Sequence, residues 1–218
     1  MGLTVKVMTE EGQELCDSYL LRLGGWTEAR YFAEAPESRI VEFEDGELIM
    51  PSPVNVRHQQ LVGFLTFLLR GYVRAKGLGE VLNGPAVVRL WPGLDYEPDI
   101  FVILGEQLRQ FETQYFSGAP ALVVEITSPG GRTYDLKHKA ANYGRHGVRE
   151  YWVVEPEEGR LYQHTLPAEA PAPYTVQDYA SGRVESLVVP GFWIEVAWLW
   201  QDPLPLEPPL LEALLRAP

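Results

Sequence analysis

The sequence has little cysteine, no long apolar run and no excess of positive charge. Cys16 is the single cysteine among 218 residues, so an internal disulfide and a zinc–cysteine site are both excluded. No apolar stretch approaches the roughly 20 residues that a membrane-spanning helix needs, and no signal peptide is visible. We therefore expect a cytoplasmic protein that contacts no membrane.

The charge balance argues against a simple nucleic-acid-binding protein. The formal net charge is -12 and the isoelectric point is near 4.8, whereas such proteins usually carry a basic surface. A nuclease is still compatible with this charge, because carboxylates that bind a divalent metal add negative charge. Local basic residues can still form a positive patch: Arg132, Lys137, Lys139, Arg145 and Arg149.

The order of the predicted elements indicates an α/β domain. Hydrophobic residues make up 46% of the chain, which is enough to build a sizeable core. Hydrophobic periodicity predicts helices over residues 9–23, 55–76 and 133–146, the last capped by Thr133, and strands over residues 86–90, 99–104, 122–126 and 151–155. Helices that alternate with strands in this way favour a mixed sheet flanked by helices.

Turn signals define the remaining elements. Asp45-Gly46 between two alternating runs predicts a hairpin, and a second hairpin is expected between residues 151–155 and 161–165. Beyond these we expect a loop over 167–173, strands at 184–189 and 192–193, and a short helix at 196–200. We assign residues 1–200 to the domain and 201–218 to a proline- and leucine-rich tail, whose leucines are expected to dock on the body or on a second copy.

Two almost wholly apolar strands each carry one carboxylate, Asp99 and Glu125. Strands of this composition are buried on both faces, where an unpaired charge is costly. Glu97, Asp99 and Phe101 are expected to share one face of their strand. If the two strands are neighbours, the acids meet near one end of the sheet and repel each other unless a cation lies between them. The pair predicts a divalent-metal site, and the alternative is that each acid is simply solvated or salt-bridged at a strand end.

The helix that follows the Glu125 strand adds a lysine. Asp135, Lys139 and Tyr143 recur at four-residue spacing and form one stripe. An ordinary ion pair between Asp135 and Lys139 explains this spacing without any function. However, the helix begins soon after Glu125 and must pack back on the sheet, so its first turns are expected beside the acids. Asp, Glu and Lys together are the minimum set for metal-assisted phosphodiester cleavage.

Two further residues are weaker candidates. His58 lies on the inward stripe of the helix over 55–76, where a lone histidine is more often structural than functional. Glu42 lies in the first hairpin, where acids are usually solvated. No Walker motif, dinucleotide fingerprint or nucleophile elbow is present.

Taken in order, these motifs resemble those of the Uma2 family, bacterial proteins described as restriction-endonuclease-like with a PD-(D/E)xK nuclease fold. The matching segments are residues 42–48, Pro51-Ser52-Pro53 with His58, Pro98-Asp99, residues 122–129, and Asp135, Lys139 and Tyr143 followed by residues 147–154. Order and spacing agree over roughly residues 10–195. The resemblance implies an α/β, restriction-endonuclease-like mixed β-sheet core flanked by helices, with an N-terminal helix and a β-hairpin.

The resemblance also implies roles for individual residues. The metal ligands would be Asp99, Glu125, the Ile126 carbonyl and Glu42. The catalytic residues would be Asp99, Glu125, Lys139 and His58. Thr127 stands where the standard motif has its lysine, so Lys139 is expected to supply the missing ammonium. Thr127, Asp135 and Tyr143 are expected to support the site or the substrate.

The implied activity is that of an endonuclease that uses Mg²⁺ or Mn²⁺ to hydrolyse phosphodiester bonds in DNA. Lys139 would orient or deprotonate the attacking water, or stabilise the pentavalent phosphorane. The alternative, from a different class, is a weak or inactive nuclease-fold protein that acts as a homodimeric interaction module. The acidic composition, the displaced lysine and the leucine-rich tail favour that alternative.

Overall fold

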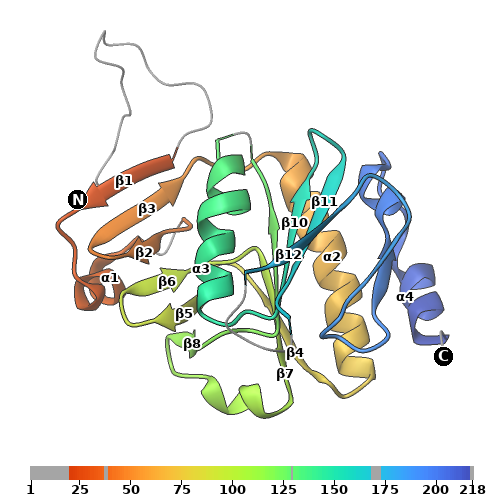
Figure 1. The fold of residues 1–218 in the computed structure, drawn as a ribbon, viewed down its shortest axis with the longest axis horizontal. Coiled ribbons are helices and arrows are strands. Elements are labelled where there is room, and N and C mark those ends of the chain that lie inside the picture. Colours follow the sequence, from red (N-terminus) through yellow and green to blue (C-terminus); the bar gives the residue numbers. More distant parts are fainter. Residues whose placement is uncertain (1–19, 37–38, 129, 168–172, 217–218) are drawn as a thin grey trace, which may run out of the picture.

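A computed structural model describes residues 20–36, 39–128, 130–167 and 173–216 (Figure 1). The N-terminal sheet has six strands in the spatial order β1 (Leu20–Gly24), β3 (Glu47–Pro51), β2 (Glu42–Glu44), β6 (Leu94–Tyr96), β5 (Val87–Trp91) and β8 (Tyr115–Ser117). The central sheet has six strands in the order β12 (Thr175–Tyr179), β11 (Arg160–Thr165), β10 (Glu150–Glu155), β9 (Leu122–Ile126), β7 (Ile100–Leu104) and β4 (Gly79–Asn83).

The helices and one small ribbon complete the described part of the chain. The α-helices are α1 (Glu28–Glu34), α2 (Val56–Ala75), α3 (Ala140–Arg145) and α4 (Glu207–Arg216). Short 3₁₀-helices η1 (Gly105–Gln110) and η3 (Val196–Trp200), the π-helix η2 (Tyr134–Lys139) and the paired strands β13 (Arg183–Glu185) and β14 (Trp193–Glu195) complete the set. None of the described helices is long and apolar enough to cross a bilayer.

Helices α2 and α3 cover opposite faces of the central sheet (Figure 1). Leu122 and Val124 of β9 belong to the core layer that contains α2, and Val123 belongs to the layer that contains Tyr143 of α3. Because side chains alternate along a strand, Glu125 points to the same face as Val123. The sheet therefore directs this carboxylate toward η2, which carries Lys139, and toward α3.

The sequence patterns with a strong local cause are confirmed. Asp45 and Gly46 have φ values of 47° and 91°, the positive angles that a tight hairpin turn requires, and they join β2 to β3. Helix α2 is capped by the Asn55 side chain, which accepts a hydrogen bond from the backbone N–H of His58 at 2.8 Å. The hairpin of β10 and β11 is also present.

The helix predicted over residues 9–23 is wrong where the structure describes it. Residues 20–24 form β1, an edge strand that pairs antiparallel with β3, and residues 9–19 lie outside the described ranges. Leu21 and Leu23 pack against the small core of the N-terminal sheet, so tertiary pairing decides for the strand. The N-terminal helix in the structure is α1, and Thr27 caps it.

The predicted cap at Thr133 is also wrong. Thr133 has helical angles of -67° and -34°, and its side chain makes no capping hydrogen bond. The chain then forms the π-helix η2, in which the N–H of Ala140 donates to the carbonyl of Asp135, five residues back. Such π-turns are rare and occur frequently at functional sites.

The C-terminal third differs from expectation at the strand predicted over 184–189. Strand β13 ends at Glu185, because Ser186 and the next two backbone N–H groups bind the buried carboxylate of Glu150 instead. Strand β12 was not predicted, and most of the loop expected over 167–173 lies outside the described residues.

The tail docks on the body of the protein through α4. A Cβ atom at Gly71 of α2 would lie only 2.5 Å from the Leu211 side chain, so the absence of a side chain at Gly71 allows this close packing. Leu214 is fully buried in the core layer that contains α2. The leucines of the tail thus contribute to the main core.

Candidate active site at the end of the central sheet

The two acids predicted to meet lie on neighbouring strands. Strands β7 and β9 pair antiparallel, with Ile100 opposite Val124. The backbone N–H of Asp99 donates to Glu125 Oε2 at 3.2 Å, and the N–H of Ile126 donates to Asp99 Oδ2 at 2.8 Å. Each carboxylate is thus hydrogen-bonded to the backbone at or beside the other acid, and both are buried. The pair is fixed by the sheet itself.

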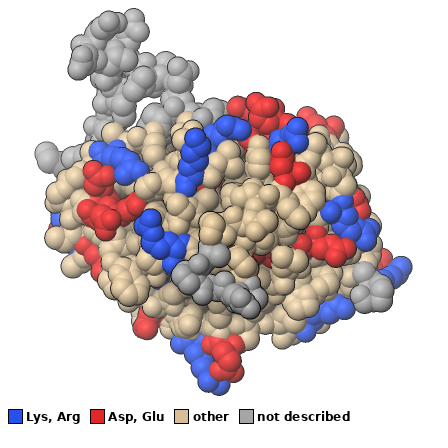
Figure 2. All heavy atoms as spheres, viewed as in Figure 1, with Lys and Arg blue, Asp and Glu red and all other residues tan. Residues whose placement is uncertain are grey.

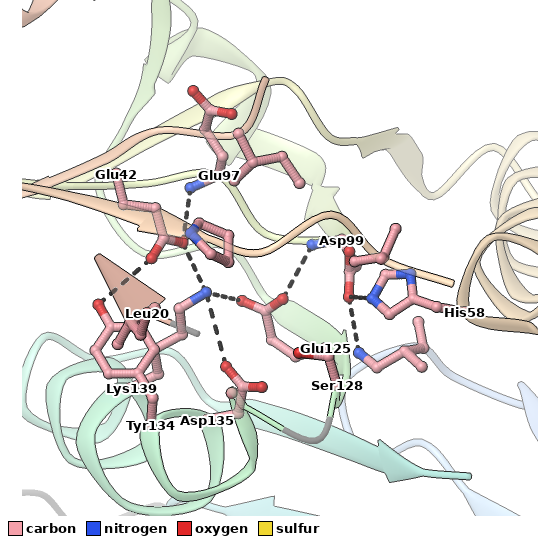
Figure 3. A pocket seen from close by; sticks show the side chains of 15 residues that line it. Leu20, Glu42, His58, Glu97, Asp99, Glu125, Ser128, Tyr134, Asp135 and Lys139 are labelled. Carbon is pink, nitrogen blue, oxygen red and sulfur yellow. Dashed lines mark hydrogen bonds and ion pairs between the residues drawn. The ribbon is translucent and has the colours of Figure 1, made fainter. Parts of the chain in front are cut away.

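Lys139 reaches this pair from η2. Its Nζ lies 2.8 Å from Glu125 Oε1, 2.6 Å from Glu42 Oε1 and 3.9 Å from Asp135 Oδ1 (Figure 3). The Lys139 side chain is only 7% exposed, and Tyr143 of α3 donates its hydroxyl to Glu125 Oε1 at 3.1 Å. The stripe of Asp135, Lys139 and Tyr143 therefore faces Glu125, as its spacing predicts.

Glu42 enters the site from the other sheet. It belongs to β2 and is 2% exposed, although acids in hairpins are usually solvated. The Tyr134 hydroxyl lies 3.4 Å from Glu42 Oε2, and the backbone N–H of Glu97 lies 3.3 Å from Glu42 Oε1. The site is therefore built where the N-terminal sheet meets the central sheet.

His58 lies at the start of α2 and contacts Asp99. Its Nε2 is 3.1 Å from Asp99 Oδ2, and its Nδ1 has no hydrogen-bond partner among the described residues. Burial lowers the pKa of the imidazole, but the hydrogen bond and the charge of Asp99 raise it more, so the net pKa lies above its usual value. His58 thus holds one oxygen of Asp99 in place.

Glu97 does not share a face with Asp99 as predicted. Strand β6 ends at Tyr96 and β7 begins at Ile100, so the two acids flank Pro98 in a connection rather than lie on one strand. The Glu97 carboxylate accepts a hydrogen bond from the Tyr31 hydroxyl at 3.4 Å and points away from Lys139 (Figure 3). Burial and the charge of Glu42 raise its pKa to about 7.

Thr127 occupies the place of the lysine in the standard motif. It is buried directly after β9, and its backbone N–H donates to the carbonyl of Val154 at 2.8 Å. The ammonium near Glu125 comes instead from Lys139.

Negative charge dominates the electrostatics of the site. Glu42, Asp99, Glu125 and Asp135 face one ammonium and one imidazole around a cavity of about 50 Å³. Burial raises the pKa of Glu125 to about 7 although Lys139 lowers it, and burial raises the pKa of Asp135 well above its usual range. Burial lowers the pKa of Lys139, but the charges of Glu125 and Glu42 hold it well above its usual range.

The donor set fits a hard divalent cation. Among the described residues, no three Asp, Glu, His or Cys side chains already converge in a metal-binding arrangement. Mg²⁺ commonly takes only one or two carboxylates and completes its shell with water and phosphate oxygens. Asp99, Glu125 and the backbone carbonyl of Ile126 supply such oxygens, and the surplus of carboxylates favours a positive ion.

Two aromatic residues of the site were missed in the sequence. The rings of Tyr96 and Tyr134 have their centroids 5.4 Å and 5.5 Å from Lys139 Nζ, close enough for cation–π interactions. Tyr134 precedes Asp135, and Tyr96 lies in a buried strand, but neither has a spacing that points to a site. Only the fold brings them to the ammonium.

Comparison with known proteins supports the family assignment. A family model named Uma2, with the description "Putative restriction endonuclease", matches residues 28–197. The chain belongs to the Uma2 family. A solved structure described as a "putative nuclease belonging to DUF820" from Anabaena variabilis has a TM-score of 0.64 and 16% identity, and the match covers 78% of this chain and 94% of that one. No curated protein matches the chain.

The predicted family and fold class are therefore confirmed. The mixed sheets flanked by helices agree with the fold of the solved relative. Membership of Uma2 supports a restriction-endonuclease-like nuclease that acts on nucleic acids.

Proposed function

We propose that this Uma2 protein is an endonuclease that uses Mg²⁺ or Mn²⁺ to hydrolyse phosphodiester bonds in DNA. One observation carries the proposal: two carboxylates from adjacent strands, Asp99 and Glu125, lie together with the Lys139 ammonium 2.8 Å from Glu125. This combination of two acids and one cation, buried beside a small cavity, suits phosphoryl transfer better than it suits a purely structural ion pair.

Asp99, Glu125 and the Ile126 carbonyl are the proposed metal ligands. A bound divalent ion would lower the pKa of a water molecule and neutralise charge on the phosphate. His58 supports this arrangement, because its contact with Asp99 Oδ2 leaves Asp99 Oδ1 for a ligand. Glu42 contacts Lys139 at 2.6 Å, and we propose that it positions the ammonium.

The charge state of Lys139 argues against one of its three candidate roles, the deprotonation of water. With a pKa well above the usual value, the side chain is an ammonium at neutral pH and donates hydrogen bonds. An ammonium cannot remove a proton from water. It can orient a water molecule, and it can stabilise the negative charge that develops on the phosphorane oxygens.

The DNA substrate must approach a protein that is acidic overall. Figure 2 shows lysine and arginine side chains scattered among acids on one face, without a single broad basic field. The side chain of Arg22 lies over the Tyr134 ring at 5.7 Å, beside the cavity that Tyr134 lines. We propose that contact with DNA depends on such local cations and is therefore weak at high salt.

The competing interaction module loses some of its support. The leucine-rich tail that favoured it packs on α2 within the same chain, and the displaced lysine reaches Glu125. The acidic composition still favours the interaction module, so the experiment must distinguish an active nuclease from an inactive protein.

The test is cleavage of supercoiled plasmid DNA with Mg²⁺ or Mn²⁺, after calorimetric titration with each metal. Asp99→Asn and Glu125→Gln should each reduce cleavage by more than about 100-fold, because each removes a charged metal ligand. Asp178→Asn, which neutralises an exposed carboxylate far from the cavity, is the matched control and should cleave normally. Circular dichroism checks that the variants fold.

Undiminished cleavage by both site variants would remove the assignment. A wild-type protein that neither binds metal nor cleaves DNA would leave the interaction module as the better description.

A further inference from the structure

Lys139 lies at the centre of the carboxylate cluster. Its Nζ contacts Glu42 and Glu125 within 2.8 Å and lies 3.9 Å from Asp135, so one ammonium is shared by three acids from three different elements (Figure 3). The same Glu125 carboxylate is half of the Asp99–Glu125 pair. A cation that binds this pair must therefore approach an ammonium that is already in place.

The cluster holds more carboxylates than cations. Glu42, Asp99, Glu125 and Asp135 lie around a cavity at which the Lys139 ammonium and the His58 imidazole are the only basic side chains among the described lining residues. The cavity beside them is about 50 Å³, and a site that holds one water molecule needs only about 10–15 Å³. The cluster therefore has both the charge and the space for an additional divalent ion.

The Lys139 ammonium has other partners besides Glu125. Glu42 holds its Nζ at 2.6 Å, and the rings of Tyr96 and Tyr134 lie about it with centroids at 5.4 Å and 5.5 Å. The ammonium can lose its contact with Glu125 and still remain hydrogen-bonded to Glu42. Release from Glu125 therefore does not leave a buried ammonium without a partner.

We propose that Lys139 is the internal counter-ion of this cluster and that a divalent cation binds Glu125 in exchange for the Lys139 ammonium. This inference rests on the metal dependence of the proposed function. Repulsion between the two cations makes each weaken the binding of the other to the shared carboxylate. The ammonium leaves Glu125 and becomes available to a phosphate group only when the divalent ion is bound. Without the ion, Lys139 stays paired with Glu125.

Nuclear magnetic resonance of the full chain tests the exchange without any substitution. The sequence has four lysines, Lys6, Lys76, Lys137 and Lys139, so lysine-selective labelling gives few signals. Titration with Mg²⁺ should shift the side-chain signal of Lys139 and leave that of Lys76, at the far end of α2, unchanged. Calorimetric binding of Mg²⁺ without any change at Lys139 would overturn the inference.

A variant tests the competition directly. Lys139→Met keeps the length of the side chain and removes its charge, so Mn²⁺ should bind about tenfold more tightly than to the wild-type protein. Lys137→Met removes the same charge from an exposed position of the same helix and should change the affinity less than about threefold. Equal or weaker binding by Lys139→Met would overturn the inference.

Thermal unfolding gives a further readout. Without metal, Lys139→Met leaves buried acids uncompensated and should unfold at a lower temperature than the wild-type protein, and Mn²⁺ should restore more stability to it than to the wild type.

If the variant does not fold even with Mn²⁺, the resonance titration of the wild-type protein decides. If neither protein binds Mn²⁺, the proposed metal dependence fails together with the inference. If the wild type binds Mn²⁺ while Lys139 is unaffected, only the inference fails.

Discussion

Two buried glutamates lie at opposite ends of the central sheet and have very different surroundings. Glu150 begins β10 and is 0% exposed, whereas Glu125 lies near the end of the parallel strand β9 and is 4% exposed. Glu150 accepts hydrogen bonds from five neutral groups: Trp152 Nε1 at 2.7 Å, Gln163 Nε2 at 2.6 Å, Ser186 Oγ at 2.7 Å, and the backbone N–H groups of Leu187 at 3.0 Å and Val188 at 3.2 Å. This carboxylate attaches the C-terminal segment to the sheet.

Glu125 is held differently. It receives the Lys139 ammonium, the Tyr143 hydroxyl and the Asp99 N–H, and the charges of Asp99 and Glu42 act on it. Burial of a carboxylate therefore does not by itself mark a functional site. A surplus of like charge beside a cavity distinguishes Glu125 from Glu150.

The largest difference is expected in stability. Glu150→Ala leaves five donors without their acceptor, so it should lower the free energy of unfolding by about 3 kcal/mol or more. Glu125→Gln removes one charge from a crowded cluster and leaves Lys139 paired with Glu42, so it should change stability little or raise it. Urea denaturation measures both.

The same two variants should show the opposite order in metal binding. Glu125→Gln should lose affinity for Mn²⁺, and Glu150→Ala should retain it in conditions where it is folded. Equal losses of stability in the two variants would show that both glutamates are structural.

A second test uses pH. Burial raises the pKa of Glu125 to about 7 from its ordinary 4.5, so the folded state holds this proton more tightly than the unfolded chain does. The stabilisation is therefore complete below about pH 4.5 and is lost as the pH rises through about 7. In EDTA, the melting temperature of the wild-type protein should fall from about pH 5 to about pH 8 more steeply than that of Glu125→Gln, by several degrees.

Differential scanning calorimetry of the two proteins measures this slope, and the other titrating groups largely cancel in the comparison. If the melting temperatures of the two proteins fall equally with pH, the pKa of Glu125 is not raised in the folded protein.

His58 allows a third test at the edge of the cluster. His58→Phe keeps an aromatic ring but removes the donor to Asp99, so affinity for Mn²⁺ and cleavage should each fall about tenfold. His58→Gln retains a donor and should recover part of the loss. Calorimetry and the plasmid assay measure both. If His58→Phe behaves as the wild type, then His58 only fills space.

The smallest effect is expected at Tyr143. Tyr143→Phe removes one hydrogen bond to Glu125, at a cost of about 1 kcal/mol in stability, and should shift the affinity for Mn²⁺ measurably. Tyr72→Phe is the matched control, since its hydroxyl donates to the Pro190 carbonyl at 2.9 Å, away from the cluster. It should lose similar stability and keep the same affinity. Identical affinities in both variants would mean that Tyr143 does not tune the site.

Much of the site was predictable because its parts lie inside strong local patterns. Asp99 and Glu125 stand out as single charges in apolar strands, and the four-residue spacing of Asp135, Lys139 and Tyr143 defines one face of a helix. Glu42 could not be found in this way, because acids in hairpins are common. Its burial comes from contact with η2, which lies far away in the sequence.

Local sequence patterns gave a wrong prediction where the residues suit two kinds of secondary structure equally well. The leucines of residues 20–23 suit both a helix and an edge strand, and pairing with β3 decided for the strand. The π-turn at Asp135 has no sequence signal of its own. The Tyr151 hydroxyl donates to the Asp135 carbonyl at 3.1 Å, so part of its support comes from the neighbouring strand β10.

The sequence by itself determined the buried central strands, the long helix α2 and the hairpin at Asp45-Gly46, because apolar periodicity and positive φ angles act over a few neighbouring residues. Only the tertiary structure decided which acids share the ammonium of Lys139 and which glutamate is satisfied by neutral donors. These outcomes depend on charges and donors that distant segments bring within 3 Å or so, where Coulomb and hydrogen-bond energies become large.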